Sequence, residues 1–276
     1  MLRILLFAGV IFGLCLVASA TTLNYPDFSS TSGLTLNGNA ATPVTGDGTV
    51  LRLASAGGVT VGSAFTTNTI SAATFSTAFN FRITDPGGSF DGTDFGADGL
   101  TFVVQSAGPN ALGDAGQAMG YSGSHLDPNV VGIVPSVAVE FDTWYNWEHD
   151  PDSNHLGIDL NGTVVSVATV GVKPNFDDGN LWHAWIDYNG TTLEVRASQT
   201  SAKPASALLA YNVNIPGILG QDSAYVGFTG ATWGGWGNHD IVNWTYSDTI
   251  VPLPTAGWLG LGLVGALAFR RQPRSF

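Results

Sequence analysis

The segment covering residues 137–155 contains the side chains in this chain with the clearest capacity for chemistry. Its donors are the oxygens of Glu140, Asp142, Asn146 and Asp150 and the imidazole of His155. Carboxylates, an amide and one imidazole together suit a hard cation that shares ligands with a transition metal. The segment therefore predicts a loop that holds two metal ions. A solvated acidic loop after a strand is the simpler alternative.

Glu140 and Asp142 belong to a run, Val137–Asp142, in which apolar and polar side chains alternate as they do in a strand. Their side chains then leave the strand on the same face, about 7 Å apart. Two carboxylates this close repel each other unless a cation, a proton or an arginine lies between them. No Lys or Arg occurs from Ile83 to Val172, so arginine is not available, which favours a metal ion.

These residues need a framework to position them, and short β-rich runs separated by glycine-rich polar connectors predict one. Asn161-Gly162 and Asn189-Gly190 each lie between two such runs, which predicts two tight hairpins. No stretch shows helical periodicity of useful length. We therefore expect a single all-β sandwich with little helix. The expected strands are Leu34–Leu36, Val50–Leu53, Phe75–Ile83, Leu100–Gln105, Val137–Asp142, His155–Leu160, Thr163–Thr169, Leu181–Tyr188, Thr192–Ala197, Ala224–Thr229 and Ile241–Tyr246.

The N-terminal residues 1–20 resemble a secretory signal peptide. Arg3 precedes an apolar run from Ile4 to Val17, and Ala18-Ser19-Ala20 forms a small-x-small cleavage site. A retained membrane anchor is the alternative, although the apolar run is short for a membrane span. The mature domain would cover residues 21–248 and would contain no cysteine, so disulfides cannot stabilise it.

This expected domain contains 21 acidic and five basic residues, a net charge of −16. Charge of this sign argues against nucleic acid and anionic lipid as partners. It fits a protein that meets neutral ligands and cations. Part of the acidity would simply keep a secreted protein soluble.

Residues 249–276 differ in composition from the domain. Val251-Pro-Leu-Pro254 precedes an uncharged stretch, Thr255–Phe269, and then Arg270-Arg271. An ordinary membrane anchor with cytoplasmic arginines is one interpretation. The order of elements also resembles the PEP-CTERM sorting tail of Gram-negative bacteria, with Leu253 where that signal usually has Glu. This resemblance implies transient membrane tethering, cleavage by an exosortase-type enzyme, and delivery to the cell surface or extracellular matrix.

Several motifs in fitting order resemble the L-type, or legume-like, lectins. Residues 139–161 are similar to the metal loop of this family, and residues 97–105 to its sugar-binding strand. Residues 75–83 and 226–244 are similar to its framework strands, so the resemblance covers roughly Asn24 to Ser247. It implies a concanavalin-A-like jelly-roll β-sandwich that binds glycans or exopolysaccharide and catalyses no reaction.

The resemblance also implies which residues hold the ions. A transition metal, usually Mn2+, would be held by Glu140, Asp142, Asp150 and His155. Ca2+ would be held by Asp142, Asp150, Asn146 and the backbone carbonyl of Trp144. The two aspartates would then bridge both ions, and Ser166 could anchor a metal-bound water.

A sugar site around Asp98 follows from the same resemblance. In the family the peptide bond before this aspartate is cis, and its carboxylate accepts hydrogen bonds from two adjacent sugar hydroxyls. Asn146 would donate through its amide nitrogen, and Trp144 would place its ring against the sugar, with core packing as the alternative. Gly116, or else Gln117, would offer a backbone N–H.

Trp233 and Trp236 stand between glycines in a loop that sets specificity in relatives. Two tryptophans in such a loop are typical of ligand platforms, although one of them could pack inward. We expect both to contact the sugar.

Two other classes of function remain open. A glycoside hydrolase on a jelly roll presents Glu-x-Asp-x-x-Glu on one strand, with its two carboxyls about 5–5.5 Å apart. Glu140 and Asp142 match the first half, but Tyr145 stands where the second glutamate is needed, so no proton donor is present. A structural matrix protein that has lost sugar binding is the second alternative, and the joint presence of Asp98, Asn146 and the metal ligands argues against it. We expect a lectin with no catalytic residue, whose single sites bind at about millimolar Kd, so that useful adhesion needs multivalent display, for example by a homo-oligomer.

Overall fold

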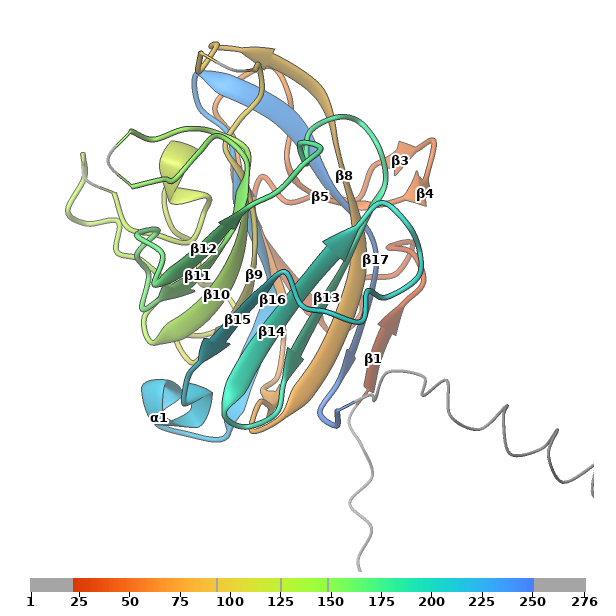
Figure 1. The fold of residues 1–276 in the computed structure, drawn as a ribbon, viewed down its shortest axis with the longest axis vertical. Coiled ribbons are helices and arrows are strands. Elements are labelled where there is room, and N and C mark those ends of the chain that lie inside the picture. The colour runs from red at the N-terminus through yellow and green to blue at the C-terminus, as the bar shows by residue number, and fades with distance from the viewer. Residues whose placement is uncertain (1–21, 93, 125, 148, 251–276) are drawn as a thin grey trace, which may run out of the picture.

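The computed structural model describes residues 22–250 except residues 93, 125 and 148. The expected signal peptide lies outside the described residues, as does all but the start of the expected sorting segment. Two antiparallel sheets pack face to face (Figure 1), which confirms the prediction of a single all-β sandwich. Within the described part, helix is confined to α1 (Ile215–Leu219) and the short 3-10 turn η1 (Gly116–Ala118). No helix there has the length and apolar character needed to cross a bilayer.

One sheet has seven strands, and the N-terminal strand of the described chain lies at one of its edges. In spatial order it contains β1 (Thr22–Tyr25), β17 (Gly235–Ser247), β8 (Phe75–Gly88), β13 (Trp182–Tyr188), β14 (Thr192–Ser198) and β15 (Leu209–Asn212), with β5 (Leu51–Ala54) also paired to β17. Because β1 and β17 are neighbours, the two ends of the described chain lie on the same edge.

The other sheet has eight strands and carries the residues of functional interest. In order it contains β12 (Ala168–Gly171), β11 (His155–Leu160), β10 (Ser136–Asp142), β9 (Gly99–Gln105), β16 (Ser223–Ala231), β6 (Val61–Thr66) and β2 (Leu34–Gly38), with β7 (Ile70–Ser71) also paired to β16. A separate two-stranded ribbon contains β3 (Val44–Thr45) and β4 (Gly48–Thr49).

Aromatic side chains fill the space between the two sheets. Phe79 on β8 packs edge to face against Phe228 on β16, with ring centroids 4.9 Å apart, and Phe228 packs in the same way against Trp244 on β17 at 5.0 Å. All three rings are buried. Burying large rings is the main source of stability available to a domain without disulfides.

The two predicted hairpins have different outcomes. Asn189-Gly190 does connect two adjacent strands, because Tyr188 on β13 pairs with Leu193 on β14. At Asn161-Gly162 the chain does turn, with φ values of 53° and 70°, but the next strand, β12, begins only at Ala168. The predicted strand Thr163–Thr169 is therefore wrong in its bounds. The extra residues form a detour that brings Ser166 back against β10.

Candidate functional site

One transverse row of the eight-stranded sheet positions the candidate site. Asp142 on β10 pairs with His155 on β11 and, on its other side, with Gly99 on β9. Gly99 in turn pairs with Ala231 on β16. Four residues from four strands therefore lie in line near one end of the sheet, and the loops that leave this end can meet.

The candidate metal ligands gather at the β10–β11 end of this row. Asp142, Asp150 and His155 each offer a ligand atom, and these atoms all lie within 4.8 Å of one another. Glu140 is next to them, with its Oε1 3.2 Å from Nε2 of His155. The Asp150 carboxylate also accepts a hydrogen bond of 2.6 Å from the backbone N–H of Asn146, which fixes the loop that carries both residues.

Electrostatics at this cluster favour a bound cation. Burial raises the pKa of Asp142 well above its usual range, and the nearby charges of Asp150 and Glu140 raise it further. Burial also raises the pKa of Asp150, to about 6. Oε2 of Glu140 and Nδ1 of His155 are buried without a hydrogen-bond partner. Carboxylates, an imidazole and orphaned ligand atoms in one buried place fit a divalent metal, since a cation would satisfy the atoms and offset the repulsion.

His155 shows how the cluster is held in the structure. Burial is the largest single influence on its ring and opposes a charge there, but the hydrogen bond to Glu140 and the charges of Glu140, Asp150 and Asp152 together outweigh burial and raise the pKa of His155. A protonated imidazole pairs with the Glu140 carboxylate, whereas a metal ligand must be deprotonated. A proton and a metal ion would therefore compete for this side chain.

Asp159 on β11 is a buried member of the cluster that we did not anticipate. Oγ of Ser166 lies 2.7 Å from Oε1 of Glu140 and 2.6 Å from Oδ1 of Asp159, so it links the two carboxylates. A Cβ at Gly157 would collide with both Glu140 and Ser166, so glycine is needed at that position. The signal was present in the sequence, because positions 155, 157 and 159 of a strand share one face.

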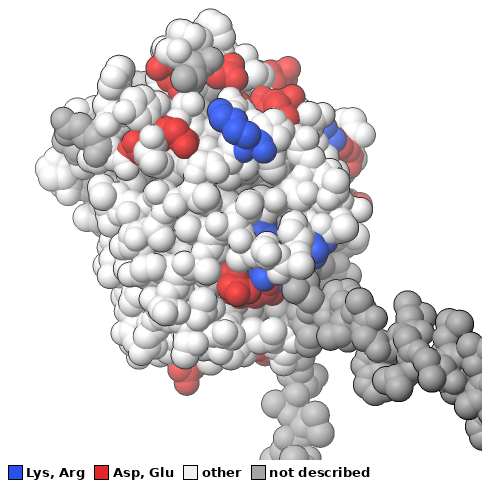
Figure 2. All heavy atoms as spheres, viewed as in Figure 1, with Lys and Arg blue, Asp and Glu red and all other residues white. Residues whose placement is uncertain are grey.

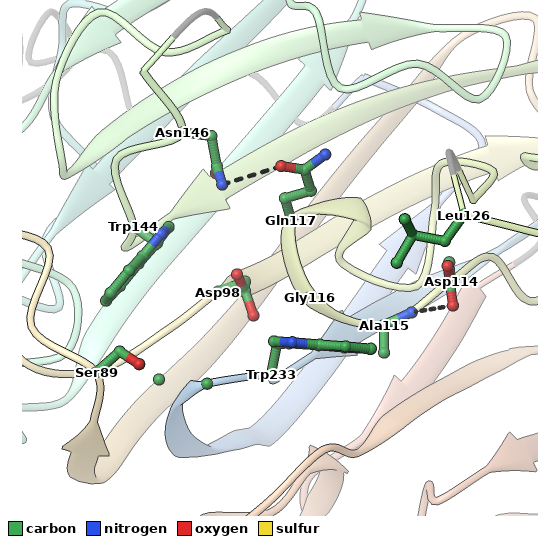
Figure 3. Close-up of a pocket in the computed structure, with 12 residues that line it drawn as sticks. Ser89, Asp98, Asp114, Ala115, Gly116, Gln117, Leu126, Trp144, Asn146 and Trp233 are labelled. Atoms are coloured by element: carbon green, nitrogen blue, oxygen red, sulfur yellow. Dashed lines mark hydrogen bonds between the residues drawn. The ribbon is translucent and has the colours of Figure 1, made fainter.

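A pocket of about 300 Å³ opens on the other side of the row, around Asp98. The peptide bond between Ala97 and Asp98 is cis. Figure 3 shows Asp98 between the rings of Trp144 and Trp233, with Ser89 toward one end and Leu126 and Asp114 toward the other. The lining residues are Ser89, Asp98, Asp114, Ala115, Gly116, Gln117, Leu126, Trp144, Asn146, Trp233, Gly234 and Gly235.

Asp98 is held rigidly at the floor of this pocket. Its backbone N–H donates to the carbonyl of Ala231 at 3.0 Å, and its own carbonyl accepts from the N–H of Thr143 at 3.1 Å. The residue is only 4% exposed, and Oδ2 has no hydrogen-bond partner. Burial raises the pKa of this carboxyl, and the charge of Asp150 raises it further. A buried acceptor with an unused oxygen is suited to receiving hydrogen bonds from a ligand.

The other predicted sugar contacts are placed as follows. Trp144, Asn146 and Trp233 line the pocket with Asp98, and Trp233 is 51% exposed, as a platform for a ligand would be. Gly116 also lines it, with φ of +68°. Its N–H, however, donates to the carbonyl of Thr232 at 3.3 Å, so the expected role of Gly116 as N–H donor would require that bond to break.

Trp236 does not lie among the described residues that line the pocket. It pairs with Gly87 near the start of β17, and its indole lies next to Gly87 and Gly88 of β8. A Cβ at Gly87 would come within 2.8 Å of Nε1 of Trp236, and one at Gly88 within 2.6 Å of the ring. The glycines leave room for Trp236 to pack against β8, as the inward-packing alternative allowed, and its role as a second ligand platform stays a prediction.

Ser89, Asp114 and Leu126 line the pocket but were not anticipated. Ser89 and Leu126 lie on loops without a recognisable pattern. Asp114 lies in the glycine loop of residues 113–120, which the family resemblance did indicate, but only Gly116 or Gln117 was expected to contact the sugar. In the face shown in Figure 2, several acidic side chains gather toward the upper end, where the long loops of Figure 1 lie, and few basic ones accompany them.

Comparison with known proteins agrees with this geometry. A family model described as "Legume lectin domain" matches residues 20–257. The chain belongs to the legume lectin family. Its fold is that of this family, as the jelly-roll prediction required: basic winged bean lectin, solved with Tn-antigen, superposes with a TM-score of 0.67 and 26% identity over 86% of this chain and 100% of that one.

Two curated relatives show how far this legume lectin domain is shared. Agglutinin-2 of Cladrastis kentukea is 32% identical over 185 residues, which are 64% of this chain and 59% of the agglutinin. The L-type lectin-domain containing receptor kinase VIII.1 of Arabidopsis thaliana is 36% identical over 180 residues, which are 63% of this chain. The match spans only 24% of that receptor kinase.

Proposed function

We propose that this legume lectin-family protein binds glycans reversibly in the pocket around Asp98 and catalyses no reaction. The observation that carries the proposal is the buried Asp98 carboxylate, whose Oδ2 lacks a partner at the floor of a pocket between two tryptophan rings. Sugars present adjacent hydroxyls and an apolar ring face, which are the groups that a carboxylate and an indole bind. A structural neighbour supports this proposal, because basic winged bean lectin was solved with Tn-antigen.

We assign roles to five residues of the pocket. Asp98 accepts hydrogen bonds from two sugar hydroxyls, and Asn146 donates through its amide nitrogen. Trp144 and Trp233 lie on opposite sides of Asp98 and contact the apolar faces of the sugar. Gly116 serves mainly to admit the Trp233 side chain, because a Cβ there would lie 3.2 Å from Cβ of Trp233.

The two ions belong to the same proposal. Glu140, Asp142, Asp150 and His155 would hold Mn2+ or another transition metal, which takes the imidazole. Asp142, Asp150, Asn146 and the carbonyl of Trp144 would hold Ca2+, which prefers oxygen ligands. The ions would supply positive charge to a buried acidic cluster. They would also order the loop that carries Trp144 and Asn146 into the pocket, so we expect sugar binding to depend on metal.

The same metal cluster weighs against the hydrolase alternative. Glu140 and Asp142, whose spacing suggested it, are not among the described residues that line the pocket, and Oε1 of Glu140 is engaged by His155 and Ser166. We therefore assign these carboxylates to the ions.

Export completes the proposed function. A signal peptide at 1–20 and a PEP-CTERM-like segment at 249–276, processed by an exosortase-type enzyme, would deliver the lectin to the cell surface or extracellular matrix. There it would meet glycans or exopolysaccharide, with multivalent display by a homo-oligomer compensating for weak single sites. The sequence patterns at the two ends support this part of the proposal.

A glycan array with the full-length protein tests the proposal directly, run with added Ca2+ and Mn2+ and again with a chelator. We expect binding only with metal, and its loss in Asp98→Asn. Asp222→Asn is the matched control, since it makes the same change of charge at the exposed residue just before β16, about 30 Å along the strand direction from Ala231. Absence of binding to any glycan under metal-replete conditions, with the fold intact, would refute the lectin function.

A further inference from the structure

We infer that the pocket selects glycans by charge: it takes a sugar with a free ammonium group in preference to its neutral N-acetylated form, and it excludes anionic sugars. This inference rests on the proposed function and names the class of ligand. Its basis is a second carboxylate in the pocket, that of Asp114, which lines the far end from Ser89.

Asp114 is fixed in place by its own loop. Its backbone N–H donates to the carbonyl of Ser122 at 2.9 Å, and its carbonyl accepts from the N–H of Gly120 at 2.8 Å. Oδ1 accepts from the N–H of Ala115 at 2.9 Å, which orients the carboxylate. A half-buried acid held in this way loses little conformational entropy when a ligand binds it.

Among the described residues, no lysine or arginine neutralises the two carboxylates of the pocket. The lining contains Asp98 and Asp114 but no Lys or Arg, and no salt bridge in the described part of the chain involves either aspartate. The sequence explains this, because Lys and Arg are absent from position 83 to position 172. Ca2+ held by Asn146 and the carbonyl of Trp144 would lie next to the pocket and would offset charge on its Asp98 side. Asp114 is not among the proposed metal ligands, so its charge would remain for a ligand.

An ammonium group matches this arrangement chemically. It supplies three N–H donors and a positive charge, and its hydrogen bonds to a carboxylate are charge-assisted. Oδ2 of Asp98 is a buried acceptor without a partner, so one sugar could satisfy it through a hydroxyl while its ammonium group faces Asp114. An N-acetyl group provides a single neutral donor instead. A uronate or sulfate would bring a further negative charge close to the two carboxyl groups of the pocket. Repulsion between like charges in this partly buried site would disfavour its binding.

Calorimetric titration of the full-length, metal-loaded protein tests the inference. The probes are glucosamine and galactosamine, each compared with its N-acetyl form, its parent hexose and its uronic acid, at pH about 6.5, where a primary amine of this class is protonated. One of the two sets of sugars, derived from glucose or from galactose, should bind better than the other. Within that set we expect the amino sugar to bind roughly five- to tenfold more tightly than its N-acetyl form, and the uronic acid not to bind. The preference should shrink as salt is added.

Asp114→Asn tests the residue, and Asp222→Asn again serves as the control. Asp114→Asn should abolish the preference for the amine, so that the amino sugar and its N-acetyl form bind with Kd values within about twofold of each other, whereas Asp222→Asn should keep the preference. Equal or tighter binding of the N-acetyl form by the wild type, or an unchanged preference in Asp114→Asn, overturns the inference and leaves the lectin function standing. Failure to bind any sugar here or any glycan on the array overturns both.

Discussion

The side-chain amide of Asn146 donates a hydrogen bond of 3.2 Å to Oε1 of Gln117 across the mouth of the pocket (Figure 3). This contact joins the loop that carries the metal ligands to the glycine-rich loop that closes the opposite wall. The amide nitrogen it occupies is the group that we assign to the sugar. Gln117 and a bound sugar would therefore compete for Asn146.

Replacing Gln117 with Ala should raise sugar affinity, because Asn146 would no longer be engaged in the free protein. A hydrogen bond of this kind contributes about 1 kcal/mol net, so we expect roughly a fivefold decrease in Kd. Calorimetry against the preferred sugar measures it. A rise in Kd would instead show that Gln117 contacts the ligand itself.

Removal of metal should destabilise the protein. An ion that binds only the folded state contributes about 2.7 kcal/mol when its free concentration is 100 times its Kd, which corresponds to roughly 5–11 °C in Tm for a domain of this size. Differential scanning calorimetry with and without a chelator measures the shift, and Asp150→Asn should lower Tm in metal but respond little to chelator. A Tm that is insensitive to chelator in the wild type would contradict the metal assignment.

Trp233→Ala and Trp236→Ala should have opposite consequences. Trp233 is exposed in the pocket, so its loss should weaken sugar binding by about tenfold, from a stacking contact of about 1–1.5 kcal/mol, with Tm nearly unchanged. Trp236 packs on Gly87 and Gly88, so its loss should lower Tm and affect affinity less. Parallel thermal melts and titrations separate the two effects, and equal loss of affinity in both variants would support Trp236 as a ligand contact.

Asp177 should make the protein less stable as the pH rises. Burial, with the charge of Asp94 as the next cause, raises the pKa of Asp177 to about 7 from an ordinary value of 3.8. The folded state therefore binds this proton more tightly than the unfolded state, and the stability it contributes is present below pH about 4 and is lost between pH about 4 and 7.

Asp177→Asn mimics the protonated carboxyl, so it should remove that loss. We expect a gain of about 1–2 kcal/mol at pH 8, or roughly 2–8 °C in Tm, and little change at pH 4. Melts across this range, with Asp222→Asn alongside, measure the slope. A variant whose stability varies with pH as steeply as the wild type would show that Asp177 is not the group responsible.

The sequence was most informative where side chains alternate along buried strands. β10 and β11 were predicted nearly to the residue, because Val137–Asp142 and His155–Leu160 carry apolar side chains and functional ones in register. β6 and β15 were missed, since Val61–Thr66 and Leu209–Asn212 are short and consist largely of small or polar residues. Their pairing depends on neighbours that are distant in the chain.

The pocket was predictable only in part for a related reason. Asp98, Trp144 and Asn146 adjoin strands whose pattern could be recognised, and the structure brings them together. Ser89 and Leu126 adjoin no such pattern, and Asp114 lies in the recognised glycine loop but was not expected to face the ligand. Trp236 could be separated from Trp233 only through its contact with Gly87 and Gly88. Which of two similar side chains faces a ligand is decided by tertiary packing, which spacing alone does not encode.

The alignment of His155, Asp142, Gly99 and Ala231 across four strands has a consequence for how such a protein can diversify. Inserting one residue into β10 would turn Glu140 and Asp142 to the opposite face and would displace the pocket floor at the same time, so both properties would vanish in a single step. Changing the length of a connecting segment such as 233–237 would leave this alignment untouched. Natural variation and engineering can therefore change ligand specificity through the connecting segments. The central strands tolerate substitutions but not a shift of register.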